Sequence, residues 1–151
     1  MMFIKIAWGC EWKTVNSRPD RPYKFPDRIT DHMKATYEMP AIYRWVIDNE
    51  YYVGETVNLC KRIRNYLNAP KPKYREDGKM LPHQQTTNIN LNARLRAGTN
   101  NRIEFLKFDE LQFGDATYKP MDLTNNHIRL MVEKIAILDH EAKHQKLLNK
   151  G

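Results

Sequence analysis

The chain has 151 residues, a length typical of one domain that is large enough to bury a core. It carries 25 Lys and Arg against 18 Asp and Glu, and this formal charge of +7 favours a polyanionic partner such as a nucleic acid. The apolar run at its start is short and interrupted by charge, so we expect neither a signal peptide nor a membrane partner. Cys10 and Cys60 lack metal-site spacing, and reduced thiols in a cytoplasmic protein are the simplest expectation.

Residues 1–39 are expected to form an arm that packs on the rest of the chain. Residues 2–8 predict a short strand. The stretch from 16 to 40 predicts an ordered loop with about one helical turn near residues 31–35. Prolines exclude a long regular element in that stretch: Pro19, Pro22, Pro26 and Pro40.

A β-hairpin and a helix are predicted next. Residues 41–47 are β-branched and aromatic, which indicates a strand. The turn chemistry of residues 48–50 leads into a second short strand over 51–53. Asn58 then predicts the N-cap of a helix over residues 59–68.

The second half of the chain predicts further elements of both types. Residues 70–82 have the composition of a loop or insertion, and a helix is predicted over 84–97, although the alternation at 89–97 would also suit a strand. A strand over 102–108 and a loop over 109–122 follow, and the last element is a long helix over 126–148. This order predicts an α+β fold with a small sheet.

Phenols and guanidinium groups are concentrated on the predicted hairpin and the helix after it. Tyr43 and Tyr52 lie on the hairpin, while Arg62 and Tyr66 are four residues apart and share a helix face. The planar fork of Arg62 suits phosphate oxygens, and a tyrosine can accept a proton from water when cations lower its pKa. Each residue alone is equally compatible with packing or solvation. The hypothesis of a phosphodiester site depends on the whole set.

Glu133 is the next candidate residue. It lies in the apolar segment 128–138, which predicts a largely buried helix. A buried carboxylate is costly unless it is paired or binds a metal, and Mg²⁺ often takes one carboxylate together with substrate phosphate and waters. Glu133 is therefore a candidate metal ligand. An ion pair with Lys134 on a narrow solvent-facing stripe is the alternative.

Residues 140–144 match the H-E-x-x-H pattern of zinc hydrolases. His140 and His144 would share a helix face and could bind zinc. The position of a third ligand is taken by Lys150, which favours a chance match on a charged helix end. A zinc-dependent hydrolase is the lesser alternative.

The spacing of the tyrosines and the arginine resembles the GIY-YIG nuclease family. The two triplets of that motif correspond to residues 41–43 and 52–54. Tyr52 precedes Arg62 by ten positions, as the family's tyrosine precedes its catalytic arginine. Tyr66 stands where some members carry a tyrosine or a histidine. The resemblance covers most of the chain after the arm.

The later residues and two departures complete this resemblance. Glu133 resembles the family's metal-binding glutamate, and Asn149 resembles the asparagine that follows it near the end of the domain. Ala41 replaces the first glycine of the motif, and the polar segment at about 70–100 is long, as in compact stand-alone members.

The resemblance implies a three-stranded antiparallel sheet flanked by helices over residues 40–151. It also implies hydrolysis of one DNA phosphodiester per active site with a single divalent cation, Mg²⁺ or Mn²⁺. In the implied mechanism, either Tyr43 or Tyr52 is the base, Arg62 steadies the phosphate and Glu133 holds the cation. The implied catalytic residues are Tyr43, Tyr52, Arg62, Tyr66, Glu133 and Asn149.

DNA recognition is expected within this domain, as in restriction enzymes or small phage endonucleases. Cutting both strands needs two active sites, so a dimer or tetramer is expected. A DNA-binding module without cleavage is the main alternative, and an ordinary solvated surface is the alternative for the Gln and Asn side chains. The candidate DNA contacts are Lys61, Arg64, Lys71, Lys73, Gln84, Gln85 and Asn88, with Arg18, Arg21, Lys24 and Arg28 in the arm.

Overall fold

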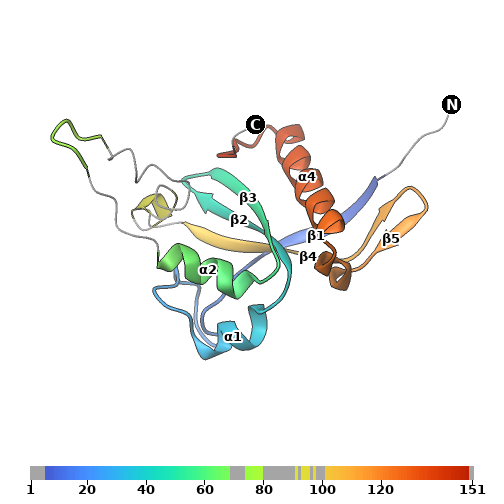
Figure 1. Cartoon of the computed structure of the whole chain (residues 1–151), viewed down its shortest axis with the longest axis horizontal. Coiled ribbons are helices and arrows are strands. Elements are labelled where there is room, and N and C mark those ends of the chain that lie inside the picture. The colour runs from blue at the N-terminus through green and yellow to red at the C-terminus, as the bar shows by residue number, and fades with distance from the viewer. Residues whose placement is uncertain are drawn as a thin grey trace.

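An antiparallel sheet with helices on both faces forms the centre of the computed structural model (Figure 1). The structure describes residues 6–68, 74–79, 91, 93–95, 97 and 101–149, without the side chains at 7 and 8. The predicted α+β class with an antiparallel sheet is confirmed. The strands run in the order β1 (Ile6–Thr14), β4 (Arg102–Phe113), β2 (Ala41–Ile47) and β3 (Glu50–Thr56), and β5 (Ala116–Tyr118) pairs with β4.

The predicted three-stranded sheet is wrong, because the sheet has five strands. The first strand, predicted over 2–8, is β1, which pairs with β4 from Ile6 opposite Phe113 to Thr14 opposite Glu104. Strand β4 continues beyond its predicted end at residue 108, and β5 folds back on it inside the predicted loop. Charged side chains in this part of β4 obscured the alternation, although Leu111 is fully buried.

Helices cover the two faces of the sheet separately. Helices α1 (Asp31–Tyr37) and α2 (Leu59–Leu67) pack on the face that carries Trp45. The opposite face, with Ile42 and Val53, carries α4 (Asn126–Ala142), preceded by the short 3₁₀ helix η2 (Pro120–Thr124). In the described part of the chain, no helix combines the length and apolarity that crossing a membrane requires.

The predicted hairpin and helix starts have clear local causes. Asp48 and Asn49 have φ values of 50° and 65°, as a tight turn between antiparallel strands requires. Asn58 caps α2, since its side chain accepts a hydrogen bond from the Lys61 amide at 3.0 Å. The helix predicted over 84–97 is seen only at residues 91, 93–95 and 97, and the rest of it lies outside the described residues.

Helix α4 differs from its prediction in length and burial. It ends at Ala142 rather than at 148, because His144 adopts a left-handed φ of 57° that turns the chain back. Only one stripe of the helix is buried, formed by Arg129, Val132, Ala136 and His140. Leu138 is 61% exposed, so the prediction of a largely buried helix is wrong.

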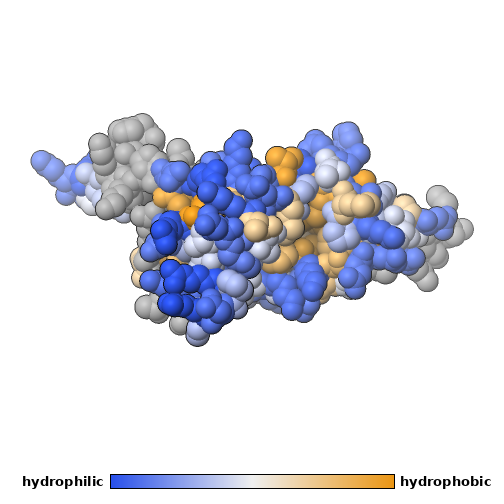
Figure 2. All heavy atoms as spheres, turned by 90° about the horizontal axis from the view of Figure 1, so that it is seen from below, coloured by the Kyte–Doolittle hydropathy of each residue, from blue (hydrophilic) through white to orange (hydrophobic). Residues whose placement is uncertain are grey.

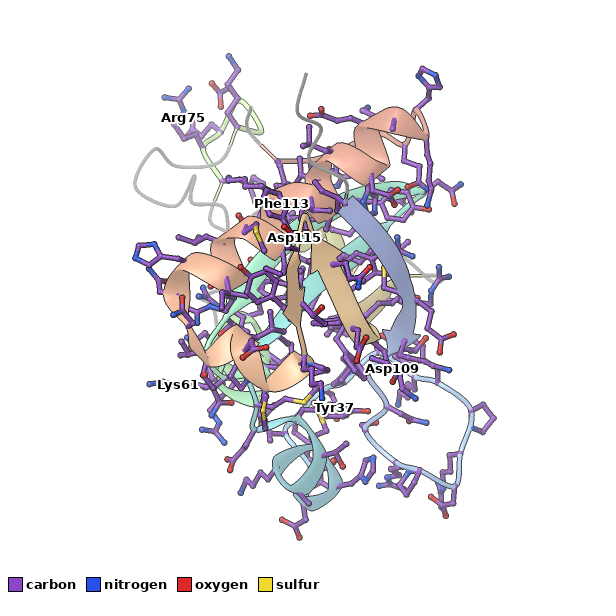
Figure 3. All side chains as sticks on the ribbon, turned by 90° about the vertical axis from the view of Figure 1, so that its right-hand side faces the viewer. Tyr37, Lys61, Arg75, Asp109, Phe113 and Asp115 are labelled. Atoms are coloured by element: carbon purple, nitrogen blue, oxygen red, sulfur yellow. The ribbon has the colours of Figure 1, made fainter. Side chains whose placement is uncertain are left out.

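An apolar groove opens between α1, β4 and η2, on the face shown in Figure 2. Its volume is about 640 Å³, and Tyr37 and Asp109 line it from two elements (Figure 3). Apolar side chains such as Phe105 and Phe108 form its walls. None of the sequence-predicted site residues lies in this groove.

Candidate active site

The Tyr43 side chain lies directly against the backbone of Gly54. Register places the two residues opposite each other on β2 and β3. A Cβ atom added to Gly54 would lie 2.5 Å from both Cζ and the hydroxyl oxygen of Tyr43, which is closer than van der Waals contact allows. Gly54 is thus required because the phenol crosses the strand at this point.

Three tyrosines from three elements meet beside this contact. The Tyr66 hydroxyl, on α2, lies within hydrogen-bonding reach of both Tyr43 and Tyr52. Trp45 packs under the group, with ring centroids 4.4 Å from Tyr66 and 5.3 Å from Tyr43. Tyr43 and Tyr66 are buried, whereas Tyr52 is half-buried and is the phenol of this cluster that reaches solvent.

The environment of the phenols opposes their ionisation. Burial raises the pKa of Tyr43 and also that of Tyr52, and the neighbouring Tyr66 adds to both shifts. The Arg62 guanidinium works in the opposite direction on both groups. In the free protein these tyrosines are therefore neutral donors and acceptors at neutral pH.

Arg62 lies near the phenols, and no described carboxylate is paired with its charge. It is half-buried on α2, and its side chain forms no ion pair with a described carboxylate. A guanidinium that is already partly desolvated and unpaired is suited to bind an anion with two parallel hydrogen bonds. Arg62 is therefore the candidate anion-binding residue of the site.

Glu133 reaches the same site from α4. Its side chain is 14% exposed, and its negative charge raises the pKa of Tyr52. Burial raises the pKa of Glu133 itself, and Lys134, whose Nζ lies 3.4 Å from Oε1, lowers it. The alternative ion pair is thus present, but Lys134 is 70% exposed, so the pair adds little stability.

A second carboxylate and its partner were missed by sequence reasoning. Glu55, one residue after Gly54, raises the pKa of Glu133. Arg129 binds Glu55 through Nε and also donates to the Leu123 carbonyl at 3.0 Å. Arg129 is 5% exposed and lies one helical turn before Glu133, so the pair fixes this part of α4 against β3. The sequence offered one signal: Arg129 lies three residues before Val132, a spacing that places both on the same, buried face of the helix.

Asn149 contacts the backbone beside the site. Its Oδ1 accepts from the Val53 amide at 2.8 Å, and its Nδ2 donates to the Val53 carbonyl at 2.6 Å. Backbone hydrogen bonds of Tyr51 with Lys146 and Leu148 extend the same pairing along the edge of β3. Asn149 thus holds Val53 on one side of Tyr52, while Lys146 and Leu148 hold Tyr51 on the other, and Asn149 is a positioning residue in this arrangement.

The histidines of the H-E-x-x-H match are separated. His140 is buried, with Nδ1 2.7 Å from the Ala136 carbonyl and Nε2 2.9 Å from an Arg44 nitrogen. Because the guanidinium can only donate, His140 accepts at Nε2 and carries its proton on Nδ1. His144 lies beyond the end of α4 and is exposed. The prediction that both share a helix face is wrong.

The predicted DNA contacts are described only in part. Lys61 extends from α2 into solvent (Figure 3), and Arg64 is half-buried one turn further along. Both lie on the helix that carries Arg62. The other five positions lie outside the described residues: Lys71, Lys73, Gln84, Gln85 and Asn88.

Comparison of the chain with models of protein families, with curated proteins and with solved structures gave no match. The assignment of a function therefore depends on the residues of the site. Within the described part of the chain, no group of three or more His, Cys, Asp or Glu side chains is arranged to hold a metal ion.

Proposed function

We propose that this chain is a DNA endonuclease of the GIY-YIG type that depends on a divalent cation. The observation that carries the proposal is that Arg62 and Glu133 both lie close enough to the half-buried Tyr52 to shift its pKa, while the buried Tyr43 and Tyr66 adjoin it. This set combines a guanidinium suited to an anion, a phenol that reaches water and a carboxylate. The three groups together can serve the hydrolysis of a phosphodiester.

The exposure of the phenols favours separate roles for the tyrosines. Tyr52 faces water, so we assign it as the base and Tyr43 as the group that orients it through Tyr66. A water bonds to phosphorus as the bond from phosphorus to the 3′ oxygen breaks, and the water's proton passes to the small fraction of Tyr52 that is ionised at neutral pH. The 3′ oxygen leaves with the electron pair and takes a proton from solvent. Arg62 holds the non-bridging oxygens as their charge grows.

Glu133 fits a role as ligand of Mg²⁺ or Mn²⁺. Burial and Glu55 both disfavour its charged form, and a cation would relieve this cost. One carboxylate with substrate phosphate and waters is common for Mg²⁺, so the single site is compatible with the chemistry. A cation bound there would supply charge stabilisation to the leaving oxygen.

A plasmid assay tests the proposal. Supercoiled plasmid is incubated with the protein and Mg²⁺ or EDTA, and nicked and linear products are measured. We expect Mg²⁺-dependent cleavage that falls at least about 100-fold in Arg62→Ala and in Glu133→Gln. Glu141→Gln is the matched control, because it makes the same change at an exposed carboxylate on α4 outside the site.

Each outcome has a distinct meaning. Plasmid binding without nicking would replace the proposal with a DNA-binding module. Cleavage that survives Glu133→Gln would overturn the metal assignment. Linear product formed in one encounter would indicate the two active sites of a dimer or tetramer, which we propose for double-strand cleavage.

A further inference from the structure

The described arginines divide into paired and unpaired groups. Five of them are paired with carboxylates: Arg44 and Arg102 on the sheet, Arg129 on α4, Arg75 in the turn at 74–79 and Arg94 in the helical residues 93–95. Those without a described carboxylate partner are Arg62 and Arg64 on α2, and Arg18, Arg21 and Arg28 in the arm. Unpaired cations thus gather at the candidate site and at one other place.

That second place is a cavity of about 490 Å³ in the arm. Three arginines and Lys24 line it, and Asp27 is the one acidic side chain in its lining. Ser17 and Thr30 add hydroxyl groups. Arg18 and Arg28 also line an adjacent hollow of about 310 Å³, where Asp20 and Asp31 lie. Positive charge therefore dominates the first cavity, and the Ser17 hydroxyl accompanies it, since the Thr30 hydroxyl already donates within the arm.

The arm is held rigidly enough to preserve this cavity. The Thr30 hydroxyl donates to the Ser17 carbonyl at 2.7 Å, and this bond joins the two ends of the loop at residues 17–30. The Tyr23 hydroxyl accepts from the Ile103 amide on β4 at 3.1 Å, and burial raises the pKa of Tyr23 to about 12. Val15 is fully buried and bonds the same strand. The cations are presented on a fixed scaffold, so ordering them costs less when an anion binds.

We infer that the arm cavity binds backbone phosphates of DNA, as a contact separate from the candidate active site. The inference depends on the proposed function for its choice of DNA as the polyanion. Exposed arginines around a concave surface suit phosphate oxygens because each guanidinium offers paired donors. Hydroxyl side chains are common partners of the same oxygens. No base-edge recognition is assigned to this cavity.

The salt dependence of DNA binding tests the inference. Anisotropy of a labelled duplex is measured in EDTA between 50 and 250 mM NaCl, where cleavage does not interfere. In Arg18→Gln/Arg28→Gln, we expect the slope of log K against log salt to fall by about 2, at roughly 0.9 per lost phosphate contact. At 0.1 M salt, affinity falls on the order of 10- to 100-fold.

The matched control is Arg75→Gln/Lys143→Gln, which removes the same charge from exposed but ion-paired side chains outside the arm. We expect its slope to stay at the wild-type value. Equal slopes for both double variants would overturn the inference, and near-ultraviolet circular dichroism checks that each variant is folded.

Two further outcomes separate this inference from neighbouring ones. Pyrophosphate titrated by calorimetry tests free phosphate as the ligand, and pyrophosphate binding lost in the arm variant with an unchanged DNA slope would overturn the DNA assignment. A reduced slope in a protein that never nicks plasmid would uphold the arm site while the proposed function fails. Intact nicking with an unchanged slope would support the proposed function and overturn the arm site.

Discussion

The ring of Tyr43 occupies the space where a side chain at position 54 would begin. A Cβ at Gly54 would approach Tyr43 Cζ to 2.5 Å. Because that ring is packed between the strand and Trp45, it cannot move away without displacing the tyrosine group. We expect Gly54→Ala to lower the free energy of unfolding by about 1–3 kcal/mol and plasmid nicking on the order of 100-fold.

Gly9→Ala provides the control for this change. No heavy atom lies within 4 Å of a Cβ built at Gly9, so the same methyl group is added without a clash. Urea unfolding and the plasmid assay should both give wild-type values for this variant. A Gly54→Ala protein with full activity would show that the position of Tyr43 does not matter.

The raised pKa of Tyr52 predicts how cleavage depends on pH. A base that is neutral at pH 7 becomes more active as the ionised fraction grows, so the rate should rise about tenfold per pH unit up to at least about pH 9. In Tyr52→Phe, the residual rate should lose this rise. Tyr74→Phe, at a tyrosine 57% exposed and outside the site, should keep it. A flat profile in the wild type would exclude Tyr52 as the base.

Asn149 is expected to act through the geometry of β3. Asn149→Ala removes both hydrogen bonds to Val53, which should cost about 1–2 kcal/mol of unfolding free energy. Because Tyr52, the proposed base, directly precedes Val53, kcat should fall more than KM rises. Asn68→Ala, on the exposed C-cap of α2, is the control. An unchanged kcat in a folded Asn149→Ala protein would refute the positioning role.

His140 should make the fold sensitive to acid. Burial, with the Arg44 charge, lowers its pKa, so the unfolded chain takes up a proton before the folded chain does. Stability from this group is complete above about pH 6.5 and is lost as pH falls towards the lowered value. Between pH 7 and pH 5, the free energy of unfolding of His140→Gln should decrease by about 1–2 kcal/mol less than that of the wild type, as measured by urea unfolding. His144→Gln, at an exposed residue, should follow the wild type.

Local signals predicted the elements that carry the site. The β-branched run of β2, the turn at Asp48 and Asn49, and the cap at Asn58 each have a short-range cause, and each is found where it was expected. The grouping of Tyr43, Tyr52, Arg62 and Glu133 as one site was predicted from their spacing and from the family resemblance, and it stays a prediction. Ala41 is 2% exposed and lies in ordinary strand geometry, so this position does not require the backbone freedom of a glycine.

Features set by distant contacts could not be read from the sequence. Strand β5 is three residues long and forms only because β4 extends to meet it. The pairing of Arg129 with Glu55 joins residues 74 positions apart, and the helix pattern alone gave no partner. The end of α4 depends on His144, whose left-handed φ is uncommon for a residue other than glycine.

The position of Trp45 gives the site an intrinsic optical probe. Its indole is fully buried between Tyr43 and Tyr66, and Nε1 has no hydrogen-bond partner among the described residues. An indole in so dry an environment emits at short wavelength. Ionisation of a neighbouring phenol would quench that emission by energy transfer. Events at the tyrosine cluster can thus be followed by fluorescence without attaching a label.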